Sequence, residues 1–224
     1  MTNLTLIIPA KLEAESLPIF LKEIKKYNFK KLIVLQEEDI ETQKSISNIE
    51  DIDILIQKKN GYGNALIEGI NATKTEYCSI INADGSMDPK YLNLMLEKCK
   101  YYDFIFCSRY EKSGGSDDDD FVTYIGNKIF TFLGNLFFKL KITDILFTYI
   151  IGKTSSFRSL NLSFYDFRIC VEIPIMAKNK KMSYSTIPSY ERSRIGGKKK
   201  VNALKDGLLI LFAMINFYFN NISK

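Results

Sequence analysis

Short apolar runs alternate with amphipathic segments along the first half of the chain, and this alternation restricts the fold more than any other feature. Helical spacing or helix-start signals mark residues 15–27, 61–71 and 89–100. Strands separated by helices, without strict polar alternation, predict a mostly parallel sheet covered on both faces, whose ligands lie at the carboxyl ends of the strands. The runs short enough to be strands are residues 4–9, 31–35, 52–56, 77–81 and 104–107.

The chain contains no histidine, which excludes several kinds of active site. Ser-His-Asp and Cys-His catalysis, histidine metal sites and the usual proton shuttle at neutral pH all require an imidazole. Catalysis must therefore depend on carboxylates, basic side chains, hydroxyls, an oxygen-bound metal or a substrate that is already ionised. The net charge of +5 favours anionic partners. Nucleic acid is disfavoured because no basic-aromatic array or DNA-binding motif accompanies this charge.

Size and cysteine usage indicate the domain organisation and the compartment. The 224 residues, 46% of them hydrophobic, suit one globular domain, which we place at residues 1–200, followed by a C-terminal helix at 201–224. Four cysteines without CxxC spacing indicate core residues in a reducing compartment. No basic leader precedes the first apolar run, so we expect a cytoplasmic protein.

The fourth apolar run ends in a turn rich in oxygen-bearing side chains. Asn82, Asp84 and Asp88 follow it within a few residues. Asn, Asp, Gly, Ser and Pro are ordinary turn and helix-cap residues, so a purely structural interpretation is open. In the other interpretation, these oxygens hold Mg²⁺ or Mn²⁺ against a diphosphate, because such ions prefer carboxylate, carbonyl and phosphate ligands.

Five segments, taken in order, resemble glycosyltransferase family 2. Their order and spacing are similar to those of its dolichol-phosphate mannosyltransferase-like branch, over roughly residues 4 to 202. The resemblance implies the glycosyltransferase A fold, a Rossmann-like domain that binds a nucleotide sugar. The segments are Leu6–Glu15, Gly61–Ile70, Asn82–Asp84, Ser108–Tyr110 and Tyr190–Lys200.

The resemblance implies a role for several residues at the predicted sheet edge. Asp84 matches the second acid of the family's DxD metal motif, whereas Asn82 replaces the first acid. The cation would then be held by Asp84, with Asp88, the neutral Asn82 and the donor's own phosphates. The residues that fall where the family contacts the nucleoside are Pro9, Ala10 and Glu13.

Two further segments are expected to contact the donor. After the second strand, the family's acidic turn for base recognition is replaced by Gln36–Asp39, in which Glu37 could accept a hydrogen bond from the base. Gly61 and Gly63 open a helix beside the predicted substrate site.

The remaining candidates would handle phosphate and acceptor. Arg109, Arg192, Arg194 and Lys200 supply positive charge, and guanidinium groups suit bidentate phosphate contacts. Asp144 matches an aspartate that the family places beside the acceptor, and with Asp84 and Arg109 it is a predicted catalytic residue. An Asp that caps a turn explains it almost as well.

The absence of histidine also bears on the acceptor. A phosphate monoester has a second pKa of about 6 and is an anion at neutral pH, so it can attack an anomeric carbon without a strong base. A saccharide hydroxyl needs a base, for which Asp144 or Glu172 are candidates. A sugar nucleotidyltransferase shares the sheet, but its glycine-rich loop is missing after the first strand. A non-catalytic module that binds nucleotide sugars is a further alternative.

Two long apolar segments leave packing within the protein and contact with a surface partner as alternatives. We expect helices at residues 121–140 and 201–219; from Leu208 to Phe219 the second would be only about 18 Å long, too short to span a bilayer. For the first helix the alternatives are core packing and contact with lipid or a prenyl chain. For the second they are contact with a membrane surface, a dimer contact and docking on the domain itself. Asp117–Asp120 precede the first helix as a solvated, self-repelling connection or a gate.

The sequence as a whole predicts an inverting, metal-dependent hexosyltransferase. It would move a sugar from a nucleoside diphosphate sugar to a polyprenyl phosphate, with the protein peripheral on the cytoplasmic face of a membrane.

Overall fold

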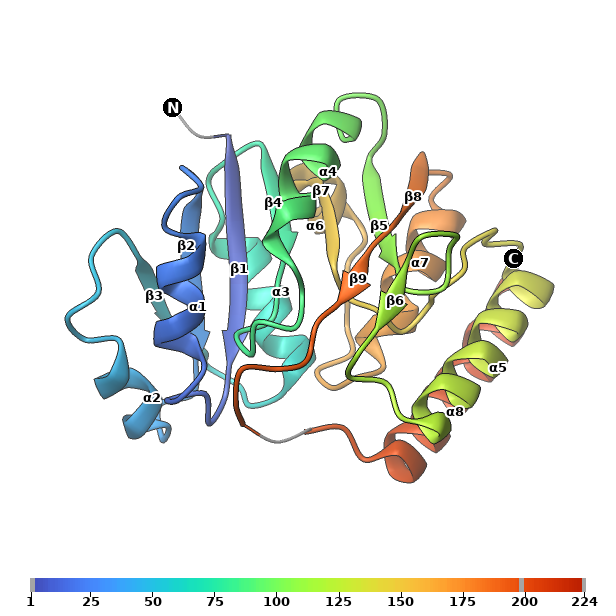
Figure 1. Cartoon of the computed structure of the whole chain (residues 1–224). Helices are drawn as coiled ribbons and strands as arrows, with labels where there is room; N and C mark the ends of the chain where they lie inside the picture. Colours follow the sequence, from blue (N-terminus) through green and yellow to red (C-terminus); the bar gives the residue numbers. More distant parts are fainter. Residues whose placement is uncertain (1–2, 198–199, 223–224) are drawn as a thin grey trace.

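Seven strands form the central sheet within residues 3–197 and 200–222, which the computed structural model describes (Figure 1). Their spatial order is β3-β2-β1-β4-β7-β5-β8. The five strands expected from the sequence are confirmed with ends shifted by one residue at most, while β7 and β8 were not predicted. The bounds are β1 Leu4–Ala10, β2 Lys30–Leu35, β3 Asp53–Ile56, β4 Tyr77–Ile80, β5 Phe104–Ser108, β7 Ile150–Lys153 and β8 Tyr184–Pro188.

The sheet is mostly parallel, as expected for the glycosyltransferase A fold. Strands β3, β2, β1 and β4 run parallel, with Ile7 of β1 paired to Leu32 of β2 and Ile80 of β4. Strand β7 lies antiparallel between β4 and β5, and β8 is parallel to β5. The carboxyl ends of β1 to β4 therefore meet at one edge, where ligands of such sheets bind.

Helices cover both faces of the sheet, which explains why β1 shows no polar alternation. Leu4, Leu6 and Ile8 pack in the core beneath α1 and α4, whereas Ile7 packs on the other face with α3 and α7. Both faces of the strand are therefore buried, and each apolar side chain contributes burial free energy. The helices have the bounds α1 Leu17–Ile24, α2 Ile40–Ser45, α3 Tyr62–Ala72, α4 Leu92–Lys98, α6 Thr154–Ser159 and α7 Ile169–Asn179, with a 3₁₀ turn, η1, at Pro89–Tyr91.

Two long helices form a layer beyond the end of the sheet (Figure 1). Helix α5, Phe121–Phe138, lies beside α8, Ala203–Ile222, and both pack against α7 in a third core cluster that includes Val171, Ile210 and Met214. One face of the C-terminal helix thus docks on the rest of the chain. No helix in the described residues is long and apolar enough to cross a membrane. The division into residues 1–200 and 201–224 stays a prediction.

A small two-stranded ribbon joins the sheet edge to these helices. Strand β6, Gly115–Ser116, pairs in parallel with β9, Tyr190–Glu191. After β6, the acidic loop, Asp117–Asp120, leads into α5. After β9, the chain crosses the carboxyl edge of β1 and β4, where Ile195 donates its N–H to the Asp84 carbonyl at 2.8 Å (Figure 1).

Candidate active site

Asp84 lies in the turn after β4, and its two carboxylate oxygens have different surroundings. Oδ1 accepts hydrogen bonds from the Ser86 N–H at 3.0 Å and the Ser86 hydroxyl at 2.8 Å. Oδ2 lies 3.5 Å from Nη1 of Arg194. The residue is only 7% exposed. One oxygen is therefore fixed by the turn, while the other faces positive charge.

Asn82 and Asp88, the other predicted metal ligands, have contacts of their own. The phenol of Tyr62 donates to Oδ1 of Asn82 at 3.2 Å and is 2.7 Å from the Thr148 hydroxyl. Burial raises the pKa of Tyr62, so this phenol stays protonated. Asp88 caps the turn at Pro89–Tyr91 through the Lys90 N–H and pairs with the Lys90 ammonium at 2.8 Å. The capping expected in the structural interpretation of this turn is thus present.

The donor atoms at this turn fit a divalent cation that is held mainly by its substrate. Within residues 3–197 and 200–222, no three or more Asp, Glu, His or Cys side chains form a group that could hold a metal ion. Mg²⁺ commonly binds through one or two carboxylates and completes its shell with phosphate and water. Oδ2 of Asp84 can supply such a carboxylate. Ligation by Asn82 and Asp88 stays a prediction.

The ends of β1 and β2 bring a second pair of acids to the same edge. Glu13 is buried after Pro9 and Ala10, and its carboxylate contacts the Ser16 hydroxyl and the Lys200 ammonium. These contacts join the predicted nucleoside-binding segment to the segment that follows β9.

Asp39, rather than the exposed Glu37, is the buried acid after β2. Its Oδ2 accepts from the Leu12 N–H at 2.6 Å, and its Oδ1 caps α2 through the Thr42 N–H at 3.3 Å. Asp39 thereby fixes the loop after β1. Its position before a short helix was the available sequence signal.

Gly61 and Gly63 are explained by close backbone packing. A Cβ on Gly61 would lie 2.1 Å from the Tyr165 carbonyl oxygen, and one on Gly63 would lie 2.1 Å from the Phe164 oxygen. Buried Glu172 holds that neighbouring loop by accepting from the Phe164 N–H at 3.0 Å. The predicted substrate contact of the two glycines is untested, but they place Tyr62 beside Asn82. Glu172, a candidate base, is engaged in holding this loop.

The cationic segment after β9 divides into two parts. Arg192 is paired with Glu23 of α1 at 2.8 Å and also donates to the Gly85 carbonyl at 2.6 Å. Arg194 instead reaches Asp84, and it forms a two-pronged pair with Asp118 of the acidic loop at 3.1 and 2.7 Å. Arg194 therefore faces the carboxylate of the predicted metal turn, whereas Arg192 contacts the backbone of that turn.

Arg109 lies at the end of β5 inside a buried ion cluster. Its guanidinium binds both oxygens of Asp144, at 2.7 and 3.0 Å, and also contacts Asp119 at 3.1 Å and Glu191 at 3.0 Å. Burial by itself lowers the pKa of Arg109, but attraction to Asp144 and Glu191 outweighs it and holds that pKa well above its ordinary value. Asp144 also accepts from Asn127. The predicted catalytic carboxylate is thus the main partner of the predicted catalytic arginine.

Glu191 was not singled out from the sequence. It is buried on β9 and accepts hydrogen bonds from Arg109 and, at 2.6 Å, from the Ser116 hydroxyl. Burial raises its pKa despite the neighbouring arginine. Its position inside the cluster depends on the pairing of β6 with β9, which no local sequence signal indicates.

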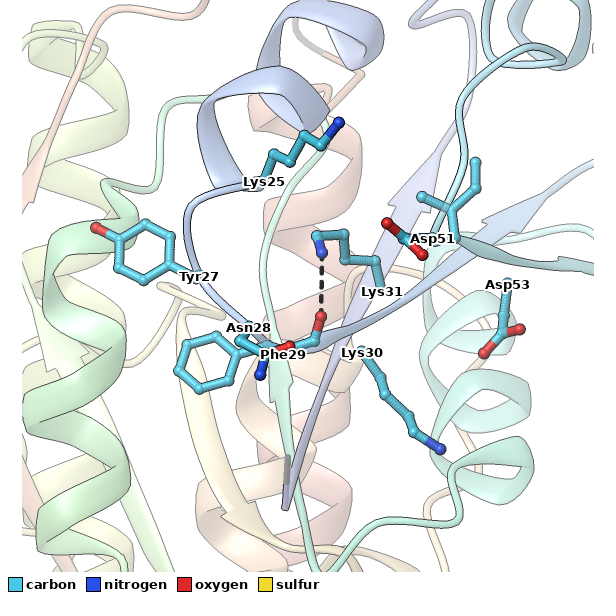
Figure 2. A pocket seen from close by; sticks show the side chains of 9 residues that line it. Lys25, Tyr27, Asn28, Phe29, Lys30, Lys31, Asp51 and Asp53 are labelled. Carbon is cyan, nitrogen blue, oxygen red and sulfur yellow. Dashed lines mark hydrogen bonds between the residues drawn. The ribbon is translucent and has the colours of Figure 1, made fainter. Parts of the chain in front are cut away.

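Two hollows lie at different ends of the molecule. One, of about 450 Å³, lies between the Arg109 cluster and the start of α5, and Tyr110, Phe121 and Tyr124 are among its lining residues. The other, of about 530 Å³, lies before β2 and β3, where Lys31 donates to the Phe29 carbonyl at 3.1 Å (Figure 2). Burial lowers the pKa of Lys31. Because the second hollow is at the amino ends of the strands, we place the active site at the opposite edge.

Comparisons with known proteins agree with this geometry. The family model described as Glycosyl transferase family 2 matches residues 5–160. The chain is similar to glucosyl-3-phosphoglycerate synthase from Mycobacterium tuberculosis in complex with Mn²⁺, UDP and phosphoglyceric acid, with a TM-score of 0.73, 11% identity, and coverage of 97% of this chain and 78% of that chain. It is also similar to mannosyl-3-phosphoglycerate synthase from Rubrobacter xylanophilus, with a TM-score of 0.71, 16% identity, and coverage of 99% and 74%. At these identities the structural likeness shows the fold.

Proposed function

The chain belongs to glycosyl transferase family 2, and on that premise we propose that it moves a sugar from a nucleoside diphosphate sugar to a polyprenyl phosphate at a membrane surface, as in the dolichol-phosphate mannosyltransferase-like branch. The observation that favours a lipid acceptor is a pair of exposed apolar stripes on α5 and α8. The hollow beside Arg109 and Tyr110 opens at the start of α5.

The stripes follow the same helical spacing on both helices. Steps of four, four, three and four residues place their members on one side of each helix. Each of these side chains is between 40% and 78% exposed, while the opposite sides pack in the core. Such continuous apolar surface is typical of contact with lipid or with another protein. The stripes are Phe121, Ile125, Ile129, Phe132 and Leu136 on α5, and Leu204, Leu208, Phe212, Ile215 and Phe219 on α8.

The hollow at the start of α5 suits the head of such an acceptor. Lys128 flanks the hollow: its ammonium lies 4.4 Å from the ring centre of Tyr110 and 5.5 Å from that of Tyr124, and both of these tyrosines line the hollow. Asp119, which also lines the hollow, is already bound to Arg109 and Tyr110. A phosphate could therefore approach Lys128 while its prenyl chain follows the stripe that begins at Phe121.

The donor would lie along the carboxyl edge of β1 and β4. Glu13 and Asp39 border the expected nucleoside site, and Asp84 with Arg194 borders the expected diphosphate site. A bound Mg²⁺ or Mn²⁺ would supply Lewis-acid stabilisation of the departing nucleoside diphosphate. Asp84 is the residue that would hold it, together with the donor's phosphates. The guanidinium of Arg194 would neutralise the charge that accumulates as the diphosphate leaves.

The reaction is a single displacement at the anomeric carbon. An ionised oxygen of the acceptor phosphate forms the new C–O bond while the bond to the diphosphate oxygen breaks, so the anomeric centre inverts. No proton has to be removed from this acceptor at neutral pH. The two candidate bases, Asp144 and Glu172, are buried and hydrogen-bonded elsewhere, which supports an acceptor that needs none.

A transfer assay tests this proposal. UDP-, GDP-, CDP- and dTDP-sugars are incubated with the full chain, Mn²⁺ or Mg²⁺, and one of three acceptors: a short polyprenyl phosphate in detergent, phosphoglyceric acid or an oligosaccharide. We expect product only with the lipid, and loss of at least about a hundredfold in turnover for Asp84→Ala. Transfer to either other acceptor alone would overturn the lipid proposal. Donor binding without any turnover would favour a non-catalytic module.

Vesicle flotation tests whether the protein binds a membrane surface. We propose that the stripes contact lipid peripherally, so the protein should float with anionic vesicles, and Phe132→Ser/Phe212→Ser should reduce the bound fraction. The alternative outcome is a monodisperse dimer that does not bind vesicles and that becomes monomeric in the same double variant. This result would show that a second copy of the chain covers the stripes.

A further inference from the structure

We infer that the Asp118 carboxylate of the acidic loop binds the Arg194 guanidinium in the place of the donor's diphosphate. The donor must displace this carboxylate in order to bind. This inference rests on the proposed donor site. It assigns a competitive role to a loop that the transfer reaction itself does not require.

The contact between Asp118 and Arg194 has the geometry of phosphate recognition. Nε of Arg194 donates to Oδ1 of Asp118 at 3.1 Å, and Nη2 donates to Oδ2 at 2.7 Å. A guanidinium binds carboxylate and phosphate oxygens through the same parallel pair of hydrogen bonds. The side chains of Arg194 and Asp118 are 21% and 16% exposed, so this pair is partly shielded from water. A phosphate and Asp118 cannot both use these two N–H groups.

The same guanidinium is shared with Asp84. Its Nη1 lies 3.5 Å from Oδ2 of Asp84, the oxygen that the Ser86 turn leaves facing the site. Without donor, Arg194 thus lies between two carboxylates. An incoming diphosphate adds negative charge beside Asp118, and this repulsion favours separation of the Asp118 carboxylate from Arg194.

The backbone around Arg194 is held, so the exchange concerns the loop. Ile195 donates to the Asp84 carbonyl and Arg192 to the Ser86 carbonyl, both at 2.8 Å. In the acidic loop, the Asp117 N–H donates to the Glu191 carbonyl at 2.9 Å, whereas the Asp118 and Asp119 N–H groups both donate to a side chain, the Ser116 hydroxyl, at 3.1 and 3.0 Å. Movement of Asp118 would therefore first break these local hydrogen bonds.

Displacement of the acidic loop would also change the hollow that we assign to the acceptor phosphate. Asp119 contacts Arg109 and Tyr110, and Asp120 caps α5 through the Thr123 N–H at 2.8 Å. These residues border the hollow at the start of α5. Donor binding would thereby alter the entrance that we assign to the lipid phosphate.

Asp117 provides a matched control within the same loop. Its carboxylate accepts a hydrogen bond from the Tyr190 hydroxyl at 2.5 Å, whereas Asp118 is the residue paired with Arg194. Asp117→Asn and Asp118→Asn remove the same charge from adjacent positions. A general electrostatic effect would change donor affinity equally in both variants, but competition for Arg194 would change it only in Asp118→Asn.

Calorimetric titration of the full chain with UDP and GDP in the presence of Mn²⁺ tests the inference. We expect Asp118→Asn to bind the nucleotide about five- to tenfold more tightly than the parent, and Asp117→Asn to stay within about twofold. Equal affinities for Asp118→Asn and Asp117→Asn would overturn the inference. If neither the parent nor any variant bound a nucleoside diphosphate, the proposed donor site itself would fail.

Hydrogen exchange of the unaltered protein gives a second test that needs no variant. The amides of Asp118 and Asp119 should exchange faster when nucleotide and Mn²⁺ are bound, because their hydrogen bonds to Ser116 open. Unchanged or slower exchange at these amides, with nucleotide bound, would contradict displacement of the loop.

Discussion

Two arginines beside the ribbon of β6 and β9 have carboxylate partners, but their surroundings differ. Arg109 is 9% exposed and contacts Asp144, Asp119 and Glu191 in one cluster. Arg194 is more accessible and contacts one carboxylate of the acidic loop and, at longer distance, Asp84. Breaking a buried pair leaves an uncompensated charge, whereas a pair near water can exchange partners at low cost.

The comparison contrasts an arginine enclosed by three carboxylates with one that we propose exchanges its carboxylate partner for the donor. Both were expected from the sequence to bind phosphate. In the structure, the guanidinium of Arg109 is bound by three carboxylates and lies 4.6 Å from the ring centre of Phe147. We therefore expect variants of the Arg109 cluster to affect stability first, and variants of Arg194 to affect donor binding first.

The largest effect is expected for Asp144→Ala. Removing this 3% exposed carboxylate deprives Arg109 of its two-pronged partner and leaves the Asn127 amide without its acceptor. The free energy of unfolding should fall by about 3–5 kcal/mol, and the melting temperature by about 10 °C, in thermal unfolding followed by circular dichroism. Asp166→Ala, which breaks the more exposed pair with Arg168, serves as control and should cost less than about 1 kcal/mol. Equal losses of stability in Asp144→Ala and Asp166→Ala would show that the buried pair is no more important to the fold than the more exposed pair.

Arg194→Gln should have a smaller effect, and on a different quantity. The dissociation constant for a nucleoside diphosphate with Mn²⁺ should rise about ten- to hundredfold, because a charged hydrogen-bond donor to phosphate is lost. The melting temperature should change by no more than about 2 °C, since the pair with Asp118 is less buried than the pair of Arg109 with Asp144.

Arg192→Gln sharpens the Arg194 result, because Arg192 belongs to the same segment but is paired with Glu23. Unchanged donor affinity in this variant would remove Arg192 from the predicted phosphate ligands. A large loss of stability in Arg194→Gln would show that Arg194, like Arg109, is needed mainly for the fold.

The smallest effect concerns the pH dependence of stability. Burial raises the pKa of Glu191 above its ordinary value of 4.5, so between these two values the native protein binds more protons than the unfolded chain. The contribution of this group to stability is therefore present below about 4.5 and is lost as pH rises through the raised pKa, at no more than about 1.4 kcal/mol per pH unit.

Glu191→Gln removes this titration while its amide oxygen can still accept from Arg109 and Ser116. Urea unfolding of both proteins at a series of pH values measures the difference. The stability of the parent should fall relative to that of the variant as pH rises through the window. Parallel curves would show that burial does not raise the pKa of Glu191, and that Arg109 is surrounded by three ionised carboxylates.

Much of the sheet could be predicted because β1, β2, β4 and β5 are buried on both faces. Residues 4–9 and 31–35 are mostly apolar, and β1 and β2 form there. Strand β7 was missed because Ile150–Lys153 continues the apolar stretch after Asp144 without a turn signal. Strand β8 was missed because Tyr184–Pro188 mixes polar and apolar residues. Neither segment shows the spacing that identifies a strand locally.

What the sequence determined by itself is the alternation of strands and helices, the acidic turn after β4 and the family. These are local properties, set by side-chain burial and turn chemistry over a few residues. Only the tertiary structure decided which charges meet: Arg109 with Asp144, Arg194 with Asp118, and Lys200 with Glu13, the last pair separated by 187 positions. Partners so distant in sequence are brought together by strand order and packing, because no local pattern specifies which carboxylate a given cation will reach.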